Sequence, residues 1–226
     1  KSPILPSHID GLEYFNQAAA FFKKDLVVLG HSKGGTVAVY AATYAEEKNQ
    51  KRITQVYNLD GPGWYPDFYE TENFKRIESK VLSVYPQDDI VGKVFYPNNN
   101  YIIIKARGKG IDQHDMLNWQ VLGQNFVPGK DYTDNSKTFF KKVNEWYETV
   151  DESKRVKFIE TLANIYTHAG FKNNYDLSQN KRTVLLSRYC SFLCLFLYLS
   201  NIYITRSTFV SIHILIFTRN CNITRS

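Results

Sequence analysis

The sequence predicts an α/β fold with a mostly parallel sheet and helices on both faces. Four apolar or β-branched segments have strand length, and each ends in a turn rich in Gly, Pro or Asp. Segments with helical patterning separate or flank them. Strands that alternate with helices at this spacing are typical of parallel sheets. The expected strands are 26–29, 52–59, 81–85 and 101–106.

The first expected helix spans residues 11–22, where Leu12, Phe15, Ala19 and Phe22 fall on one face. The strand at 26–29 follows it and leads through a glycine-rich turn into a second helix at 36–47. These three segments form one continuous helix–strand–helix unit.

The remaining strands are marked by the turns that end them. Residues 52–59 end in Asp60-Gly61-Pro62-Gly63, and a short polar helix is expected at 66–79. Residues 81–85 are stopped by Pro86-Gln87-Asp88-Asp89, and residues 101–106 run into a glycine-rich loop before His114. Two amphipathic helices are then expected, at 136–149 and 151–168.

Only four strands are visible, and the first of them, 26–29, leads into Gly30-His31-Ser32-Lys33-Gly34, which has the G-x-S-x-G spacing of a nucleophile elbow. A complete α/β-hydrolase sheet has several strands before the strand that carries this elbow. We therefore expect N-terminal strands to be missing. Residues 1–180 are predicted to form a partial α/β-hydrolase domain, and residues 181–226 to form an atypical tail outside the fold.

The tail differs from the rest of the chain in composition. Residues 177–226 contain six Lys and Arg and no Asp or Glu, and they hold all three cysteines of the chain. The apolar run 192–199 is far shorter than the roughly 20 residues that span a bilayer. We interpret this tail as out-of-frame or read-through translation, and the alternative is a membrane-associating segment. The net charge of +6 comes entirely from it, so it does not indicate a nucleic-acid partner.

Gly30-His31-Ser32-Lys33-Gly34 matches the G-x-S-x-G nucleophile elbow, with a strand before it and a helix after it. The elbow needs glycines on both sides of the serine because the backbones pass closely there. It would direct the N–H of Lys33 at the oxygen of an attacked carbonyl, as half of an oxyanion hole. A phosphate-binding turn is the alternative, but the glycine spacing and the Gly-Lys-Ser/Thr ending of a P-loop are absent.

A catalytic serine needs a histidine base and a carboxylate that orients the base. In α/β-hydrolases both follow the serine in the chain, on loops after later strands. His114 is the expected base. Asp88 is the preferred acid, because it stands two residues before Ile90 as in many hydrolases. Asp89 is the alternative, because it stands directly before Ile90-Val91 as in fungal-type lipases. Asp60 is a further candidate, although its Gly-Pro-Gly setting suggests a structural turn.

The motifs at 30–35, 38–42, 57–63, 87–92 and 113–119 together resemble an uncharacterised bacterial family of lipase-like α/β-hydrolases. The shared domain of that family has no assigned function, and the family is related to the class 3 lipases. The resemblance covers roughly residues 10–170. It implies the triad Ser32, Asp88 and His114, and it implies no particular substrate.

The sequence thus predicts a serine-dependent, lipase- or esterase-like carboxylic ester hydrolase. The alternative is a non-catalytic or truncated protein of the same fold. Four aromatic residues after the Gly-Pro-Gly turn are predicted either to line an acyl pocket or to pack in the core or a lid: Trp64, Tyr65, Phe68 and Tyr69. We expect no cofactor and no metal, a small-molecule or lipid ester as substrate, no nucleic acid, membrane association only through the tail, and a cytoplasmic location.

Overall fold

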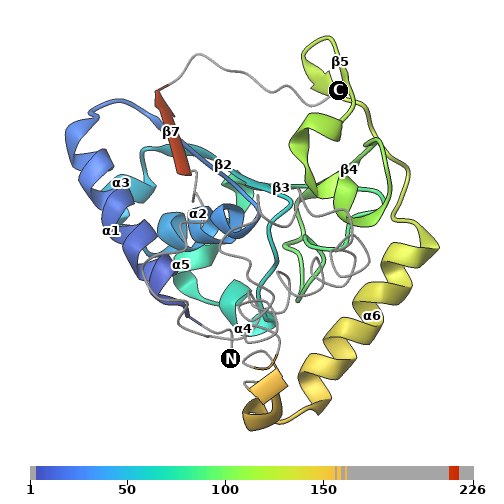
Figure 1. Ribbon diagram of the computed structural model, residues 1–226. Helices are drawn as coiled ribbons and strands as arrows, with labels where there is room; N and C mark the ends of the chain where they lie inside the picture. The colour runs from blue at the N-terminus through green and yellow to red at the C-terminus, as the bar shows by residue number, and fades with distance from the viewer. Residues whose placement is uncertain (1–3, 156, 159–160, 162–213, 219–226) are drawn as a thin grey trace. The chain divides into compact units, whose positions relative to one another are not determined.

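The computed structural model describes residues 4–155, 157, 158, 161 and 214–218. Its main sheet has the strand order β4-β3-β2-β1-β7 (Figure 1). Strands β1 to β4 are parallel to one another, and helices surround the sheet, so the predicted α/β class is confirmed. The strands are β1 (Leu26–His31), β2 (Ile53–Leu59), β3 (Val81–Pro86), β4 (Tyr101–Ile104) and β7 (Ile214–Thr218).

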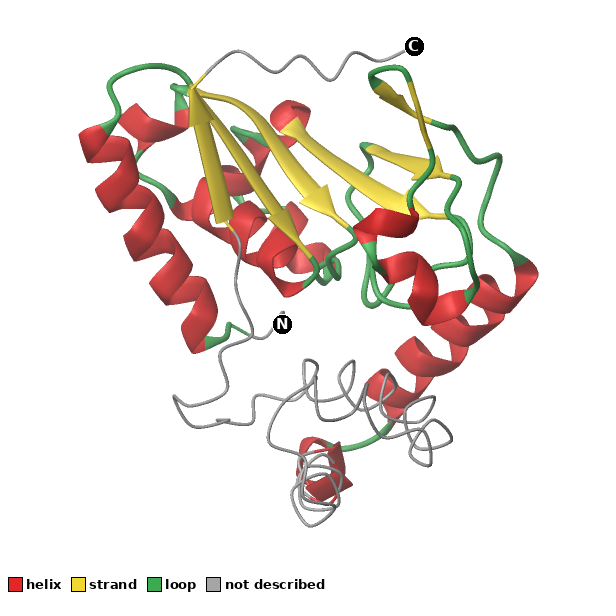
Figure 2. Cartoon of the chain, turned by 45° about the horizontal axis from the view of Figure 1, so that its top comes forward, coloured by secondary structure: helices red, strands yellow, loops and turns green. Residues whose placement is uncertain are grey.

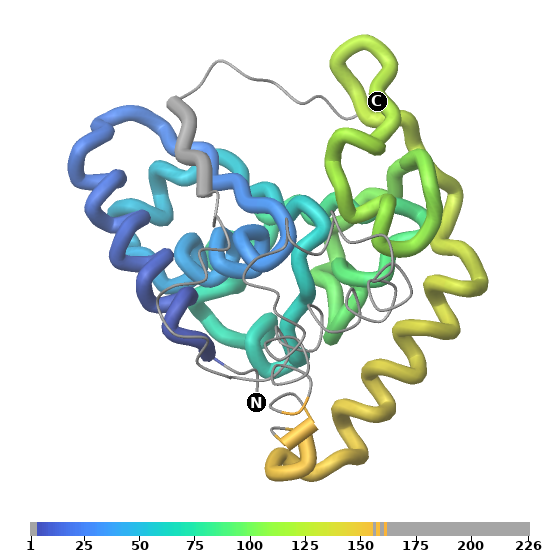
Figure 3. The backbone as a smooth tube through the Cα atoms, in the orientation of Figure 1, coloured from blue at the N-terminus to red at the C-terminus, as the bar shows by residue number. Residues whose placement is uncertain are grey.

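The chain crosses the sheet in one direction, from β1 through β2 and β3 to β4, as the colour gradient of the backbone tube shows (Figure 3). Consecutive parallel strands place their carboxyl ends at one edge (Figure 2). In open parallel sheets this edge is where ligands and active sites are found.

The other elements are α1 (Pro6–Phe21), α2 (Lys33–Tyr44), α3 (Glu47–Gln50), α4 (Pro66–Tyr69), α5 (Glu72–Lys75), η1 (Glu78–Lys80), η2 (Gly110–His114), η3 (Met116–Asn118), β5 (Val121–Leu122), β6 (Asn125–Phe126) and α6 (Asp134–Thr149).

The segment 66–79 was expected to form one helix and instead forms three short helical pieces. Pro66 opens α4 because its fixed φ suits the first position of a helix. Thr71 then begins a new helix, since its side chain accepts a hydrogen bond from the N–H of Phe74. Because Thr71 starts a separate helix, the segment 66–79 does not continue as one helix past α4.

Helix α2 lies in the middle of the core on one face of the sheet. Ten of its twelve residues are buried, from Gly34 to Thr43. Four of the ten, at 37, 38, 41 and 42, are valine or alanine and fully buried, so the helix can lie close to both the sheet and α1. Phe15 of α1 and Leu26 and Val28 of β1 pack in the same cluster.

The opposite face of the sheet is covered by Trp119, directly after η3, and by Phe126 of β6. Their rings meet edge to face at 5.5 Å. They pack with Leu82, Val84 and Ile104 in a second cluster of buried side chains. Because β1 alternates Leu26 and Val28 toward α2 with Val27 and Leu29 toward this cluster, it has the pattern of a strand covered on both faces.

Strand β7 corrects one expectation. Residues 214–218 belong to the tail that was placed outside the fold, and they pair antiparallel with β1 from Leu26 to Gly30. For this stretch the expectation is wrong, because an unpaired edge of β1 offers a row of backbone hydrogen-bonding groups to any extended segment. The apolar run 192–199 lies outside the described residues.

The chain divides into two compact units, Lys1–Asn144 with Ile212–Ser226, and Glu145–Ser211. The predicted boundary at residue 180 lies outside the described residues and stays a prediction. In the second unit the described residues include the end of α6, where Trp146 packs its ring on that of Phe158 at 5.5 Å. Within the described part of the chain, no helix has the length and apolarity to cross a bilayer.

Candidate active site

The turn between β1 and α2 places Ser32 in a backbone conformation that few non-glycine residues adopt. Its φ is 56° and its ψ is −131°. Its N–H donates to the carbonyl of Leu59 in β2 at 2.9 Å, and its own carbonyl accepts from Gly35 at 2.9 Å. Backbone strain held by surrounding hydrogen bonds is found preferentially at functional positions. The geometry is that of the predicted elbow.

The glycines of the elbow are needed for close backbone approach. A Cβ atom at Gly30 would lie 2.0 Å from the carbonyl oxygen of Gly34. At Gly35, the next residue, a Cβ atom would lie 2.1 Å from the side-chain oxygen of Asn58. No side chain fits at these distances, so the strand and the helix meet here only because both positions are glycine.

Lys33, the predicted oxyanion donor, is the first residue of α2. Amides in the first turn of a helix have no carbonyl partner within that helix, and the helix dipole favours negative charge there. The backbone of Lys33 is therefore suited to an oxyanion. Its side chain is half-buried, and burial lowers the pKa of its amino group.

The loop that carries His114 is held from three directions. Gln113 donates from its side-chain nitrogen to the carbonyls of Ala106 at 3.2 Å and Gly108 at 3.0 Å. Trp119 donates from its indole nitrogen to the carbonyl of Gln113 at 2.8 Å. His31, next to the serine, hydrogen-bonds through Nε2 to the carbonyl of His114 at 2.9 Å. The ring of His31 also packs on that of His114, with centroids 4.7 Å apart.

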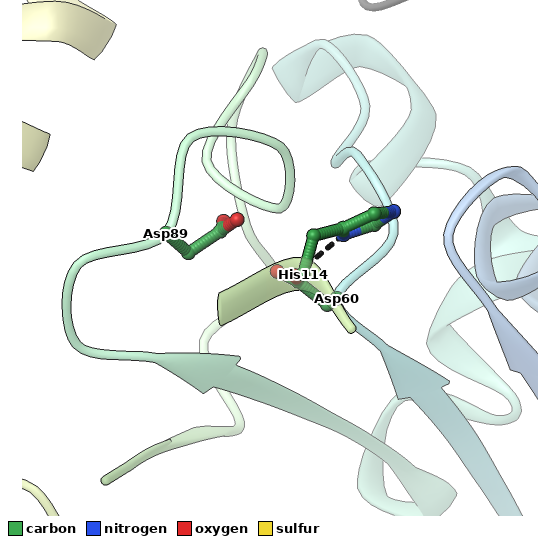
Figure 4. Close-up of side chains that lie close together, drawn as sticks. All are labelled: Asp60, Asp89 and His114. Atoms are coloured by element: carbon green, nitrogen blue, oxygen red, sulfur yellow. Dashed lines mark hydrogen bonds and ion pairs between the residues drawn. The ribbon is translucent and has the colours of Figure 1, made fainter. Parts of the chain in front are cut away.

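The carboxylate that contacts His114 is Asp60. Its Oδ2 lies 2.7 Å from Nδ1 of His114, and its side chain is fully buried (Figure 4). A carboxylate accepts, so Nδ1 of the ring carries the proton and Nε2 is left to act as a base. Figure 4 shows the second ring nitrogen pointing away from both nearby carboxylates.

Asp60 is fixed by the turn that follows β2. Its φ is 54°, and its N–H donates to the carbonyl of Val84 in β3 at 2.9 Å. Asn58 shapes the turn, because its side chain accepts from the N–H of Gly61 at 3.0 Å and donates to the carbonyl of the same residue at 3.1 Å. These hydrogen bonds fix the turn and therefore the direction in which the side chain of Asp60 points.

Asp88, the preferred acid in the sequence, has hydrogen-bond partners other than His114 in this structure. Its carboxylate accepts hydrogen bonds from the N–H of Gly110, at 2.9 Å, and from the hydroxyl of Thr133. Its backbone N–H donates to the side chain of Gln113 at 2.8 Å. Asp88 thus connects the loops around the site, and within the described part of the chain its carboxylate bonds to Gly110 and Thr133, whereas His114 bonds to Asp60.

Asp89, the alternative acid, is fully buried and lies in the same cluster as Asp60 and His114. The ligand atoms of these three residues are all within 4.8 Å of one another. The two carboxylate oxygens of Asp89 accept from the N–H groups of Val91, at 2.8 Å, and Gly92, at 2.5 Å. Asp89 is therefore a near neighbour of the acid–base pair without being the direct partner of His114.

Burial dominates the ionisation of the cluster. It raises the pKa of Asp60 to about 7. Burial raises the pKa of Asp89 well above its ordinary value, and the nearby Asp60 raises it further. Burial lowers the pKa of His114, whereas Asp89 and then Asp115 act in the opposite direction. At neutral pH the imidazole is therefore neutral and can accept a proton.

Asp60, Asp89 and His114 are also the residues within the described part of the chain that could hold a metal ion. Two ligand atoms bound to one zinc ion at about 2.0–2.1 Å each stand more than 3 Å apart in tetrahedral geometry. The 2.7 Å between Nδ1 and Oδ2 is instead the length of a charge-assisted hydrogen bond. The geometry thus favours an acid–base pair.

Trp64 and Phe68, for which a pocket and the core were both considered, belong to the core. Their rings stack at 4.2 Å with an angle of 9° between planes, and each is 3% exposed. They pack in the cluster that contains α2. Burial on this scale leaves little of either ring to contact a substrate.

Of the three acids, Asp60 is the one that the sequence favours least. The signal that favoured it was its position directly after β2, the strand next to the elbow strand. The Gly-Pro-Gly sequence that follows Asp60 instead suggests a purely structural turn, because glycine and proline are common in turns without any catalytic role.

A family model described as Mbeg1-like matches residues 2–164, which is well over half of the chain. The search of curated proteins found no match, and the search of solved structures found none either.

Proposed function

We propose that this chain, which belongs to the Mbeg1-like family, is a serine-dependent carboxylic ester hydrolase of the α/β-hydrolase type. The family description names no reaction, so the proposal rests on the site. The observation that carries it is the 2.7 Å hydrogen bond between buried Asp60 and His114, whose backbone and ring contact His31, the residue before the strained Ser32. Ser32, Asp60 and His114 follow one another in the chain in the order of an α/β-hydrolase triad.

The proposed reaction begins with attack by Ser32 Oγ on the carbonyl carbon of an ester. His114 takes the hydroxyl proton at Nε2, and Asp60 stabilises the imidazolium through Nδ1. The tetrahedral oxyanion accepts a hydrogen bond from the N–H of Lys33. His114 then returns the proton to the departing alkoxide, which leaves as an alcohol and produces an acyl-serine.

Water completes the cycle by the same steps. His114 removes a proton from the water, the resulting hydroxide attacks the acyl-serine, and the proton returns to Ser32 Oγ. The net reaction converts an ester and one water into a carboxylic acid and an alcohol. Each role needs a neutral imidazole at the start, and the burial that lowers the pKa of His114 favours that state.

Hydrolysis of a short-chain aryl ester by the full chain tests the proposal. We expect Ser32→Ala to lower kcat by about 10⁴-fold or more, since removal of a triad serine has effects of that size. The matched control is Ser79→Ala in η1, an exposed serine outside the site, which should retain wild-type turnover. Equal turnover in Ser32→Ala and the control would overturn the proposal.

A further inference from the structure

The second buried carboxylate of the site has no part in the proposed reaction. Asp89 and Asp60 are each 0% exposed, and both lie within 4.8 Å of His114 ligand atoms. Within the described residues, no Lys or Arg forms a salt bridge with either carboxylate, and the ion pair of Asp60 is with His114. A buried pair of like charges without a cation is strongly unfavourable.

One oxygen of Asp60 lacks a donor. Oδ2 is bonded to His114, whereas Oδ1 is buried and receives no hydrogen bond from the described part of the chain. A buried acceptor without a donor destabilises the folded state. Gly92, on the loop after Asp89, lies against this oxygen, because a Cβ atom at that position would lie 2.5 Å from Oδ1 of Asp60.

We propose that Asp89 is a positioning residue that, in its protonated form, donates a hydrogen bond to Oδ1 of Asp60. This contact satisfies the open acceptor and leaves one negative charge in the cluster, on the carboxylate that faces His114. The inference rests on the proposed function for its catalytic meaning. Its protonation state can be measured independently of any activity.

The surroundings of Asp89 are compatible with a protonated acid. Its two oxygens accept from the N–H groups of Val91 and Gly92, and a carboxylic acid oxygen that donates a proton can still accept one hydrogen bond. These two N–H groups fix the direction of the carboxyl group. The arrangement resembles other buried carboxyl pairs, in which one member retains a proton that the other gives up.

Other titratable groups act on the pair. Tyr85 in β3 and Tyr132 before α6 both interact electrostatically with Asp60 and Asp89, and burial raises the pKa of both phenols, so they stay neutral. Lys93, after the Gly92 turn, adds a positive charge, and its amino group lies 3.9 Å from the ring centre of Tyr132. Asp115 acts on His114 from the exposed side.

Carboxyl ¹³C NMR of the full chain labelled at aspartate tests the protonation state directly. At pH 8, we expect one aspartic acid to remain protonated in the wild type and to disappear in Asp89→Asn. Asp115→Asn is the matched control, because it removes an exposed carboxylate near His114 that does not belong to the cluster, and it should retain the signal. Absence of a protonated carboxyl in the wild type, or its persistence in Asp89→Asn, would overturn the inference.

Ester hydrolysis tests the positioning role. Asn is neutral and can donate an N–H to Oδ1 of Asp60, and its amide nitrogen cannot accept from Val91 or Gly92. Because it keeps the donor to Asp60 and loses one acceptor, Asp89→Asn should keep kcat within about tenfold of the wild type. Asp89→Ala offers no donor and should lose about 100-fold in kcat with little change in KM. Equal losses in the two variants would contradict the role. If Ser32→Ala retains activity while the protonated carboxyl is present, the proposed function fails and the carboxyl pair remains.

Discussion

Asp60 and Asp88 are both carboxylates at the carboxyl end of a strand, and their contacts separate their roles. Asp60 is fully buried and bonds to the imidazole of His114. Asp88 is half-buried and bonds to Gly110 and Thr133 on two different loops. In the proposed mechanism Asp60 orients the base, whereas Asp88 holds the loops that surround it.

Substitution by asparagine should distinguish the two acids. Asp60→Asn is expected to lower kcat by about 10³- to 10⁴-fold, because an amide favours the wrong imidazole tautomer. Asp88→Asn should lower kcat less than tenfold and should decrease the free energy of unfolding by about 1–3 kcal/mol. Steady-state kinetics and urea denaturation measure the two effects, and the reverse order of kcat losses would restore Asp88 as the acid.

The raised pKa of Asp60 also predicts how stability depends on pH. Its pKa is about 7 when folded, against an ordinary value of 3.8. Between these values the folded state binds more protons than the unfolded state, so stability should fall as pH rises from about 4 to about 7 and then level off. Denaturation measured from pH 5 to 8 should show a shallower slope in Asp60→Asn than in the wild type. An identical slope in both proteins would show that Asp60 does not titrate in this range.

The elbow is the element that the sequence predicted most completely. Glycine spacing and an apolar run are local signals, and the structure places β1, Ser32 and α2 in that order. The choice among the three acids, in contrast, cannot be made from local sequence signals. Asp60, Asp88 and Asp89 all emerge at one edge of the sheet, and which of them reaches His114 depends on contacts with residues far away in the chain, such as Thr133.

Gly30 provides the test at this scale. We expect Gly30→Ala to prevent correct folding or to decrease the free energy of unfolding by several kcal/mol, because its Cβ would overlap the carbonyl of Gly34. Gly123→Ala is the control: Gly123 has a φ of 63° but open space around its Cβ position, so the cost should be about 1–2 kcal/mol. Circular dichroism with urea denaturation compares the two. Similar costs would show that close approach does not constrain the elbow.

At the scale of the whole molecule, the sheet joins segments from the two ends of the chain. β1 lies between β2 and β7, and β7 comes from residues 214–218. Composition gave no indication of this pairing, because it identified the tail as different from the domain without indicating what it contacts. Which distant segment pairs with a strand depends on which edge of the folded sheet is exposed. Local sequence patterns do not reveal that edge.

A chain that ends at residue 211 should therefore be less stable than the full chain. Successive residues of a strand direct their backbone groups to opposite sides, so about half of the β1 amides should lose protection against hydrogen exchange. The amides that bond to β2 serve as the internal control and should change less. Equal protection of β1 in both chains would contradict a structural role for β7.

The measurement that tests the central claim most directly is the reaction of the full chain with a fluorophosphonate probe, followed by peptide mapping. The account predicts one adduct, on Ser32, and no adduct in Ser32→Ala. It also predicts that His114→Ala reacts at least about 10³-fold more slowly, since the serine then lacks its base. An adduct on another residue, or labelling of His114→Ala at the wild-type rate, would contradict the proposed catalytic site.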